Sequence, residues 1–378
     1  MRIGILTLPL HTNYGGILQV YALQTVLERM GHKVVVFDTP NKSYMPPLWK
    51  LPVSMTKRVL LKGLGKVDRI FIEHHLNKTL PVIAKYIQPF IDYHIHRKVI
   101  RKFTDLKSQD FDAIVVGSDQ VWRSIYFIPM WFGQPIENAY LFFTKGWKIK
   151  RISYAASFGT DKWEYNKEQT LHSKEALQMF DAVSVREENG VKLCKQYFEV
   201  DALHVLDPTM LLDANDYIEL FKQKQTPKSK GNLLNYVLDE TDEIENLIKK
   251  VASVKKMIPF AVNNPYEGDE TKPLNQRIKP SVETWLRGFY DADFVITDSF
   301  HACVFSIIFK KQFIVVGNRE RGMARFESLL KMFGLEERLV DEKVDINTLQ
   351  SIDYDKVYNH YGKLKEKSLH FVFENLVS

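Results

Sequence analysis

One histidine, His301, stands at a point in the sequence that is suited to chemistry. It follows the short apolar run FVITDS (294–299) and opens the helix-like stretch HACVFSIIFKK (301–311). A side chain between a buried strand and a helix faces the edge of a parallel sheet where ligands bind. Histidine is also the side chain best matched to proton transfer near neutral pH. We therefore expect His301 to act as a general acid or base, with a packing role as the alternative.

Arginines follow two other strand-like runs and are suited to holding an anion. Arg186 comes directly after AVSV (182–185), and its planar guanidinium fits a carboxylate or a phosphate. An ion pair with Glu187 or Glu188 is the alternative for Arg186. A second group of polar residues lies at the end of the run FIVVGN and just after it: Asn318, Arg319, Arg321 and Arg325. We expect this group to bind an anion such as phosphate, with a solvated loop as the alternative.

The segment HTNYGG (11–16) joins a strand-like run to a helix-like one. The backbone N–H groups of two glycines at a helix start can approach an anion closely, and the helix dipole favours negative charge there. Asn13 and Tyr14 add side-chain donors. We predict a loop that binds an anion or the acceptor, formed by Asn13, Tyr14, Gly15 and Gly16. A tight turn that needs glycine is the alternative.

The segment VGSDQVWR (116–123) also lies at the end of a strand-like run. We expect Ser118, Asp119 and Gln120 to face the same edge of the sheet. Asp119 is suited to accepting hydrogen bonds from sugar hydroxyls, and Trp122 offers a ring face for stacking. A helix N-cap is the alternative interpretation of Ser118 and Asp119.

These residues are placed by a regular alternation of short apolar runs and helix-like segments. Such βα units predict parallel sheets with right-handed crossovers. The runs fall into two sets, so the fold class we predict is α/β, with two Rossmann-like doubly wound halves and a cleft between them. The strand-like runs are residues 3–7, 33–38, 113–119, 151–157, 182–186 and 204–208 in the first set, and 232–239, 294–299 and 313–318 in the second.

The length of 378 residues exceeds what one hydrophobic core usually supports, so we expect more than one domain. We predict an N-terminal α/β domain over residues 1–220 and a C-terminal α/β domain over 221–355. A final helix over 356–378 is expected to pack back across the molecule. Prolines break up short helical patterns at about 43–107, which predicts a helical insert in the first domain.

The insert accounts for the net positive charge of the chain. Residues 50–107 hold 13 Lys and Arg against four Asp and Glu, whereas the whole chain has a net charge of only +6. Two interpretations stay open: solvated helix faces, or a surface that contacts anionic phospholipid headgroups at the inner face of the cell membrane.

Several classes of protein are excluded by what the sequence lacks. It has neither a G-x-G-x-x-G nor a Walker phosphate loop, no H-E-x-x-H, and only two cysteines, so we expect no dinucleotide cofactor, no metal and no disulfide framework. Basic runs interleaved with aromatic residues are missing, which argues against nucleic-acid binding. No run of about 18 apolar residues occurs, and the start lacks a signal-peptide core. We expect a cytoplasmic protein.

Taken together, the motifs resemble those of the polysaccharide pyruvyl transferase family. The resemblance rests on GILTLPLHTNYGGILQVYALQ, DAIVVGSDQVWR, RISYAASFG, SVREENG, VLDPTMLL, VITDSFHACVFSIIF and RGMARFESLL, which occur in the family's order. The basic insert, residues 222–290 and the C-terminal tail lie outside these blocks. The combination is specific, although no block is so alone. The family resemblance implies a two-domain fold of the glycosyltransferase-B type.

The resemblance also implies a reaction in which phosphoenolpyruvate is the co-substrate. Its pyruvyl group would be transferred to a sugar of a surface or capsular polysaccharide, or of a lipid-linked precursor, as a ketal. His301 matches the family's catalytic histidine, and Arg186 and the later arginines would bind the donor. Many members carry an arginine two residues before the histidine, where this chain has Ser299. Ser299 can donate one hydrogen bond to the donor but brings no charge, so Arg321 or Arg325 would substitute, or the donor differs.

Two other functions remain alternatives at this stage. One is a glycosyltransferase that uses a nucleotide sugar, because the same architecture serves both reactions. The other is a glycan-binding protein without catalytic activity.

Overall fold

The computed structural model describes residues 1–40, 72–317 and 323–377. Within this part of the chain, the first sheet has seven strands, and all its neighbours pair in parallel. Their spatial order is β3 (Arg97–Val99), β2 (Lys33–Asp38), β1 (Arg2–Leu6), β4 (Ala113–Val116), β5 (Lys150–Ala156), β6 (Ala182–Val185) and β7 (Leu203–His204). The strand order reverses between β1 and β4, so a crevice opens beyond the carboxyl ends of these two strands.

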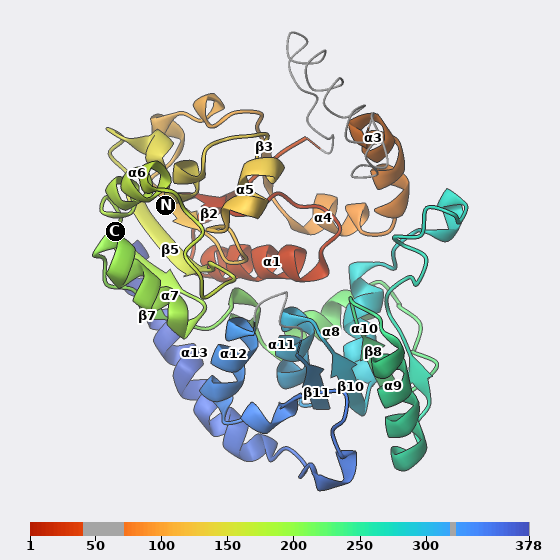
Figure 1. Cartoon of the computed structure of the whole chain (residues 1–378). Coiled ribbons are helices and arrows are strands. Elements are labelled where there is room, and N and C mark those ends of the chain that lie inside the picture. The colour runs from red at the N-terminus through yellow and green to blue at the C-terminus, as the bar shows by residue number, and fades with distance from the viewer. Residues whose placement is uncertain (41–71, 318–322, 378) are drawn as a thin grey trace.

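The second sheet has five strands among the described residues, again all parallel. Their order is β12 (Leu339–Val340), β11 (Gln312–Val316), β10 (Phe294–Thr297), β8 (Leu233–Tyr236) and β9 (Pro259–Phe260). Here the order reverses between β8 and β10. Figure 1 shows the first sheet in the upper half of the molecule and the second in the lower half.

The predicted fold class is confirmed: two doubly wound α/β halves, each built on a parallel sheet. The central strands are buried on both faces, which is why they are continuous apolar runs in the sequence. Three short strands, β3, β9 and β12, were not predicted. Two of them, β3 and β9, lie at the outer edge of a sheet, and β12 closes the other edge of the second sheet. With two or three residues each, they carry no periodic pattern.

Helices pack on both sheets, and the first half contains α1 (Tyr14–Arg29), α3 (Ile72–Ile83), α4 (Gln88–His94), α5 (Ser124–Met130), α6 (Lys167–Leu177) and α7 (Glu188–Leu193). The remaining helices are α8 (Ala214–Gln223), α9 (Asp242–Lys255), α10 (Val282–Asp291), α11 (Phe300–Ile308), α12 (Ala324–Phe333) and α13 (Tyr354–Leu376). One continuous cluster of buried apolar side chains crosses from α1 to α10 and α11, so the two halves share a core.

The predicted helical insert at 43–107 is only partly described. Residues 41–71, which hold much of its basic charge, lie outside the described residues. The rest contains α3 and α4 as expected, but it also contains β3, which pairs with β2 and extends the first sheet. The prediction of a purely helical insert is therefore corrected at its C-terminal end.

The predicted boundary between residues 220 and 221 falls inside α8. This helix packs against α10 of the second half, and Tyr217 on α8 makes an edge-on contact with Phe305 on α11 at 4.9 Å between ring centroids. In the structure the chain therefore passes to the second half before α8 rather than after it.

The last helix, α13, begins in the second half and ends against the first. Ser368 Oγ accepts a hydrogen bond from the backbone N–H of Leu206 at 3.1 Å, and the Lys150 ammonium donates to the carbonyl of Val377 at 2.7 Å. The two ends of the chain lie on the same side of the molecule (Figure 1). None of the described helices is both long enough and apolar enough to cross a membrane.

The buried contact of α13 with Leu206 yields a test of this docking. Ser368→Ala would leave the Leu206 N–H without an acceptor in a buried position, and such a loss costs about 1–3 kcal/mol. We expect the free energy of unfolding, measured by urea denaturation, to fall by that amount. Ser351→Ala, at an exposed position, is the matched control and should change it by less than about 0.5 kcal/mol. Equal stability of the two variants would contradict the docking contact.

Candidate active site

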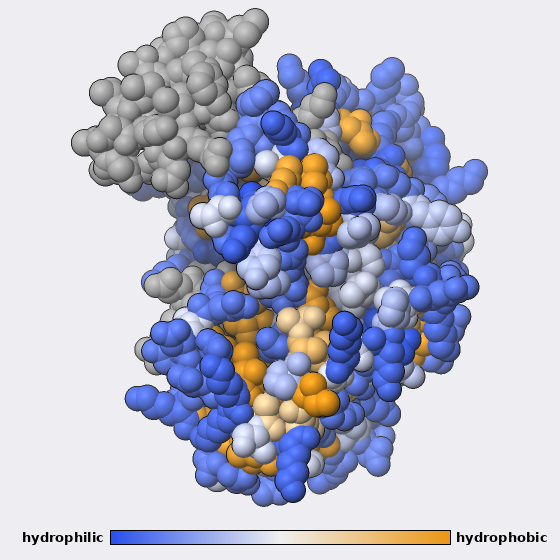
Figure 2. Space-filling model, turned by 90° about the vertical axis from the view of Figure 1, so that its right-hand side faces the viewer, coloured by the Kyte–Doolittle hydropathy of each residue, from blue (hydrophilic) through white to orange (hydrophobic). Residues whose placement is uncertain are grey.

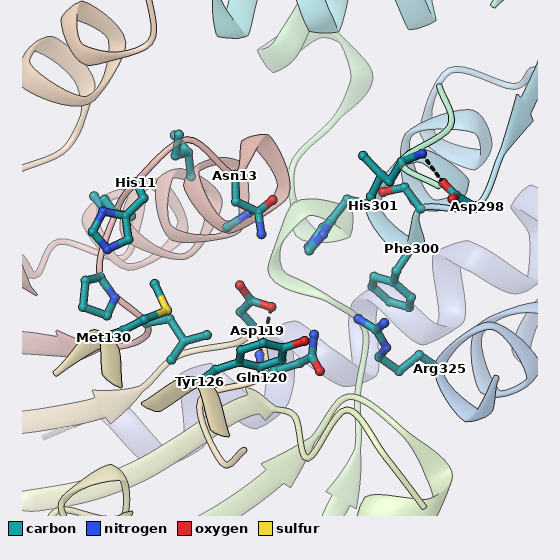
Figure 3. A pocket seen from close by; sticks show the side chains of 17 residues that line it. His11, Asn13, Asp119, Gln120, Tyr126, Met130, Asp298, Phe300, His301 and Arg325 are labelled. Carbon is teal, nitrogen blue, oxygen red and sulfur yellow. Dashed lines mark hydrogen bonds between the residues drawn. The ribbon is translucent and has the colours of Figure 1, made fainter. Parts of the chain in front are cut away.

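The carboxyl ends of both sheets meet at one cavity of about 500 Å³. The first half contributes the loops that follow β1 and β4, and the second half contributes the loops that follow β8 and β10. These are the four strands at which the two strand orders reverse, the place where doubly wound sheets bind ligands. Figure 3 shows the residues that line this cavity, which we call the central cavity: Leu8, Pro9, Leu10, His11, Asn13, Gly16, Ile17, Asp119, Gln120, Tyr126, Met130, Leu238, Asp298, Ser299, Phe300, His301 and Arg325.

His301 lies in the first turn of α11, immediately after β10, and its side chain is about 10% exposed. Its Nε2 atom is 3.6 Å from Oδ2 of Asp207, a separation too long for a hydrogen bond but short enough for an ion pair when the ring is protonated. In Figure 3 the ring of His301 is directed toward the region of Asn13 and Asp119. The structure therefore places His301 where the sequence predicts it, at a strand-to-helix junction that faces a cleft.

Asp207 is a fully buried carboxylate that links several parts of this region. Its Oδ2 accepts hydrogen bonds from Arg186 Nη1 at 3.0 Å and from Ser118 Oγ at 3.2 Å, and its Oδ1 accepts from the N–H and hydroxyl of Thr209. Burial alone would raise the pKa of Asp207, but the neighbouring His301 and Arg186 lower it by more. The pKa therefore lies well below its usual range, and the carboxylate stays negatively charged.

Arg186 does not line the central cavity but lies beneath it. Besides Asp207 it contacts Glu187 through Nε at 3.4 Å, and its guanidinium stacks on the ring of Phe300 at 4.4 Å. Burial lowers the pKa of Arg186, but the charges of Glu187 and Asp207 raise it by more, so the group stays positively charged. The alternative of a structural ion pair with Glu187 is thus present in the structure, whereas Glu188 pairs with Lys331 instead.

Among the described residues of the predicted donor group, Arg325 lines the central cavity. It lies in the first turn of α12 and also approaches the ring of Phe300, at 6.0 Å. Burial and the nearby charge of Arg186 lower the pKa of Arg325 to about 10, so it remains positively charged at neutral pH. Two cations close together in a buried region favour an anion beside them. Asn318, Arg319 and Arg321 lie outside the described residues.

The glycine-rich loop lies partly at the central cavity, which Asn13 and Gly16 line. Asn13 caps α1, because its Oδ1 accepts the N–H of Gly16 at 3.3 Å. Tyr14 turns away from the central cavity: its hydroxyl donates to the carbonyl of Pro280, and its ring stacks on Trp285. The predicted contact of Tyr14 with a ligand at this loop is therefore not found in the central cavity.

Gly15 is required by the packing of His301. A Cβ atom at this position would lie 2.0 Å from Nδ1 of the His301 ring, which is far closer than van der Waals contact allows. The absence of a side chain lets α1 and α11 approach each other at their first turns. The alternative interpretation, in which the glycines serve only a turn with positive φ, is wrong for Gly15, which lies in the helix.

The segment after β4 divides between the cavity and the interior. Asp119 and Gln120 line the cavity, and Asp119 adopts a left-handed backbone conformation with φ of 66°. Ser118 is buried and donates its hydroxyl to Asp207, so it supports the site without lining it. Trp122 is 1% exposed, stacks on Tyr140 and offers no free ring face, because packing within the first half covers it.

Ser299, which stands where many family members have arginine, lines the cavity as the N-cap residue of α11. Its backbone N–H donates to Thr297 Oγ1 at 3.0 Å. The cavity therefore has a small polar side chain at this position and a guanidinium from α12 nearby.

Four residues of this region were not singled out from the sequence: His11, Asp207, Asp298 and Phe300. Burial lowers the pKa of His11, so this second histidine of the cavity stays neutral at physiological pH. Asp298 accepts the backbone N–H groups of Leu238 and Asp239 and so fixes the loop after β8. The sequence does place Asp207 at the end of the strand-like run HVLDP (204–208), and such a position indicates a side chain near the ligand-binding edge of the sheet, as it does for His301.

The cavity is electrostatically suited to an anion on one side and to proton transfer beside it. Both α1 and α11 begin at its wall, and helix N-termini favour negative charge. Arg325 adds a positive charge, whereas Asp119 and Asp298, which also line the cavity, accept backbone N–H groups. Across the described residues, no group of three or more His, Cys, Asp or Glu side chains is arranged to hold a metal ion.

These features define the general class of the molecule. It is a two-domain α/β protein with a ligand site between its two doubly wound halves and a histidine at the wall of that site. The particular family follows from a match over most of the chain. The family model described as polysaccharide pyruvyl transferase matches residues 13–320, and the chain belongs to this family. A search of curated proteins finds no match.

Solved structures similar to this chain include several enzymes of nucleotide sugars. UDP-GlcNAc 2-epimerase from Methanocaldococcus jannaschii is 12% identical, with a TM-score of 0.46 over 96% of this chain and 92% of that one. The corresponding epimerase from Neisseria meningitidis, bound to UDP-GlcNAc, is 10% identical, with a TM-score of 0.45 over 100% and 95%. An alpha-glucosyltransferase in complex with UDP and DNA is 10% identical, with a TM-score of 0.47 over 99% and 95%.

Adding one methyl group at Gly15 tests whether the position of the His301 ring depends on this close approach. Gly15→Ala should displace the His301 ring, because the new Cβ would overlap it. Misplacing a catalytic group by about 1 Å can lower the rate by about a hundredfold, so we expect turnover to fall at least about tenfold. Turnover should be measured per folded enzyme, with a melting curve alongside.

Gly362→Ala is the matched control for this test. Gly362 lies on α13 and does not line the central cavity, and its Cβ would meet no other atom within 4 Å. Alanine also favours the helix more than glycine does, by about 1 kcal/mol in each variant. Equal activity of the two variants would show that the position of His301 does not depend on Gly15.

Proposed function

We propose that this protein transfers the pyruvyl group of phosphoenolpyruvate to two hydroxyl groups of one sugar. The product would be a pyruvate ketal on a surface or capsular polysaccharide, or on its lipid-linked precursor. The observation that supports this most directly is that His301 and Arg325 line one cavity at which α1 and α11 both begin. A proton-transfer group thereby lies beside a place that favours a doubly anionic donor.

The proposed reaction needs one proton donor and two additions at the same carbon. His301 in its protonated form donates a proton to the methylene carbon of phosphoenolpyruvate, and C2 becomes electrophilic. A sugar hydroxyl adds to C2 and returns its proton to the imidazole. The C2–O bond to phosphate then breaks, and a second hydroxyl adds to C2 while its proton passes to the departing phosphate. Each turnover consumes one phosphoenolpyruvate and releases one inorganic phosphate.

The donor carries a carboxylate and a phosphate, and both need partners in the cavity. Arg325 supplies a guanidinium, which binds such groups through paired hydrogen bonds. The first turns of α1 and α11 supply the positive ends of their dipoles. We propose that Arg325 takes over the charge that the family's arginine provides where this chain has Ser299.

Asp207 and Arg186 act as positioning residues in this proposal. The Asp207 carboxylate, 3.6 Å from His301 Nε2, limits the orientation of the imidazole ring. Arg186 neutralises Asp207 and supports the ring of Phe300, which lines the cavity beside Arg325. Arg186 therefore contacts both Asp207, beneath the cavity, and Phe300, in the wall that would face the donor.

Replacement of the histidine tests its proposed role as proton donor. His301→Gln keeps a hydrogen-bonding side chain but removes the titratable proton. We expect turnover per folded enzyme to fall at least about a hundredfold, while the affinity for phosphoenolpyruvate changes little, because the cations hold the anion. Pyruvate transfer should be followed by phosphate release and by mass spectrometry of the glycan.

His360→Gln, an exposed position on α13, is the control and should retain wild-type turnover. A structural histidine would behave differently from the proposed one: His301→Gln would lower the melting temperature, and activity would fall only in step with the folded fraction. Near-normal turnover of His301→Gln would remove it from the mechanism.

Replacement of the cavity arginine tests the donor site. Arg325→Gln removes the charge but keeps most of the side-chain length, so we expect the dissociation constant of phosphoenolpyruvate to rise at least about tenfold, as the loss of one charge-assisted hydrogen bond implies. Isothermal titration at physiological salt is the measurement. Arg101→Gln, an exposed position in the first half, makes the same change in net charge and should leave the affinity unaltered.

Uridine diphosphate should be titrated in the same series. Binding of uridine diphosphate with no binding of phosphoenolpyruvate would overturn the proposal in favour of a nucleotide-sugar donor. Unchanged affinity of Arg325→Gln for phosphoenolpyruvate would show that another group holds the donor.

A further inference from the structure

A second cavity, of about 470 Å³, lies beside the central one. The two share Leu238 as a wall, and consecutive residues of the loop after β1 face them, with Asn13 lining the central cavity and Thr12 the second. We call it the side cavity; its other lining residues are Tyr14, Leu80, Ile83, Tyr236, Val237, Glu240, Asn263, Asn264, Pro265, Glu267, Gly268 and Lys279.

The side cavity is bounded by both halves of the molecule. α3 supplies one wall, and the segment after β9 supplies another; in Figure 1 this segment lies just below α3 at the right-hand side. The two walls are joined by a hydrogen bond from the N–H of Lys279 to the carbonyl of Ile83 at 2.9 Å, and by a contact of His75 with Glu270 at 3.1 Å. The cavity is therefore a bounded space between the halves rather than a dent in one of them.

The charged groups that line the side cavity leave no cation unpaired among the described residues. Its cation among the described lining residues, Lys279, is paired with Glu267 at 2.7 Å, and Glu240 adds a second carboxylate. The remaining polar groups are amides and hydroxyls. Such a lining disfavours a phosphate but suits sugar hydroxyls. A hydroxyl can donate a hydrogen bond to a carboxylate and can either donate to or accept from an amide.

The polar wall after β9 is held in a fixed shape. Asn264 donates to the carbonyls of Gln276 and Ile278, both at 2.8 Å, and accepts the N–H of Tyr266. Its neighbour Asn263 donates to the carbonyl of Val237 at 3.4 Å, while its buried Oδ1 has no hydrogen-bond partner. The backbone contacts of the two asparagines therefore hold this wall in one shape.

The surface around this side of the molecule agrees with a polar ligand. Figure 2 turns the right-hand side of Figure 1 toward the viewer and shows a mostly hydrophilic face with a narrow apolar band. A glycan has this mixed character, since its hydroxyls are polar and the carbon faces of its rings are apolar.

We infer that the side cavity binds a further sugar of the acceptor glycan, adjacent to the sugar that receives the pyruvyl group. The inference rests on the proposed function, in which the central cavity holds the donor and the reacting sugar. The glycan would pass across the shared wall at Leu238, with its hydroxyls toward Glu240. The enzyme would therefore prefer an acceptor of at least two sugars over a single sugar.

Gly268 offers a way to block the side cavity without disturbing the fold. A Cβ atom at this position meets no other atom within 4 Å, so Gly268→Trp can place its ring in the open space beside the wall. Gly362 on α13 has the same open surroundings, so Gly362→Trp is the matched control at a distant site. Both variants are expected to melt as the wild type does.

The probes are fragments of the host cell's own surface polysaccharide, released by mild acid, which also removes pyruvate ketals, and separated by size. Isothermal titration compares single sugars with oligosaccharides for each full-length protein. For the wild type and Gly362→Trp we expect oligosaccharides to bind at least about tenfold more tightly, as one or two extra hydrogen bonds imply. Gly268→Trp should lose this gain.

Phosphoenolpyruvate is titrated separately, and its affinity should be the same in all three proteins. A gain with length that survives in Gly268→Trp, or no gain in the wild type, would overturn the inference about the side cavity. If phosphoenolpyruvate fails to bind while Gly268→Trp still abolishes the gain, the donor assignment fails and the glycan site stands.

Discussion

The site depends on the burial of one carboxylate. Asp207 is removed from water, and a buried charge is tolerated only when it is paired and hydrogen-bonded. Its partners come from the ends of β4 and β6, from its own loop and from α11 in the other half of the molecule. Because one charge must satisfy all of them, the positions of Ser118, Arg186 and His301 are coupled. The carboxylate thereby places the histidine of the second half next to residues held by the first sheet.

The same arrangement of charge bears on how the two cavities would divide the proposed ligands. Arg186, which pairs with Asp207, and Arg325 both approach the ring of Phe300. Two positive charges therefore lie on one side of the central cavity. The side cavity, across Leu238, has its lysine already paired with Glu267, and Glu240 adds a second carboxylate. In the proposed function, the anionic donor would be drawn to the wall at Arg325, and the sugar next to the reacting one to the far side of Leu238. The placement of charge, rather than the shape of either cavity alone, would then separate the donor from this part of the acceptor.

The sequence predicted the two sheets because their central strands are buried on both faces and carry continuous apolar runs. It also placed His301 correctly, because a junction between strand and helix is a local signal. The other site residues depend on contacts between distant segments. Trp122 looked like a ligand-facing aromatic, yet packing buries it, and Tyr14 lines the side cavity rather than the central one. Asp207 was overlooked because aspartate before proline is an ordinary turn signal, and only the fold shows that Arg186 needs it.

The central claim is that phosphoenolpyruvate gives up its pyruvyl group to a sugar diol in the cavity of His301. The most direct measurement uses phosphoenolpyruvate labelled with carbon-13 at C2, together with the unpyruvylated host glycan and purified enzyme. The account predicts a new carbon-13 resonance from a quaternary ketal carbon on the glycan, and one inorganic phosphate released for each label transferred. Label that stays in phosphoenolpyruvate or appears only as free pyruvate would contradict it.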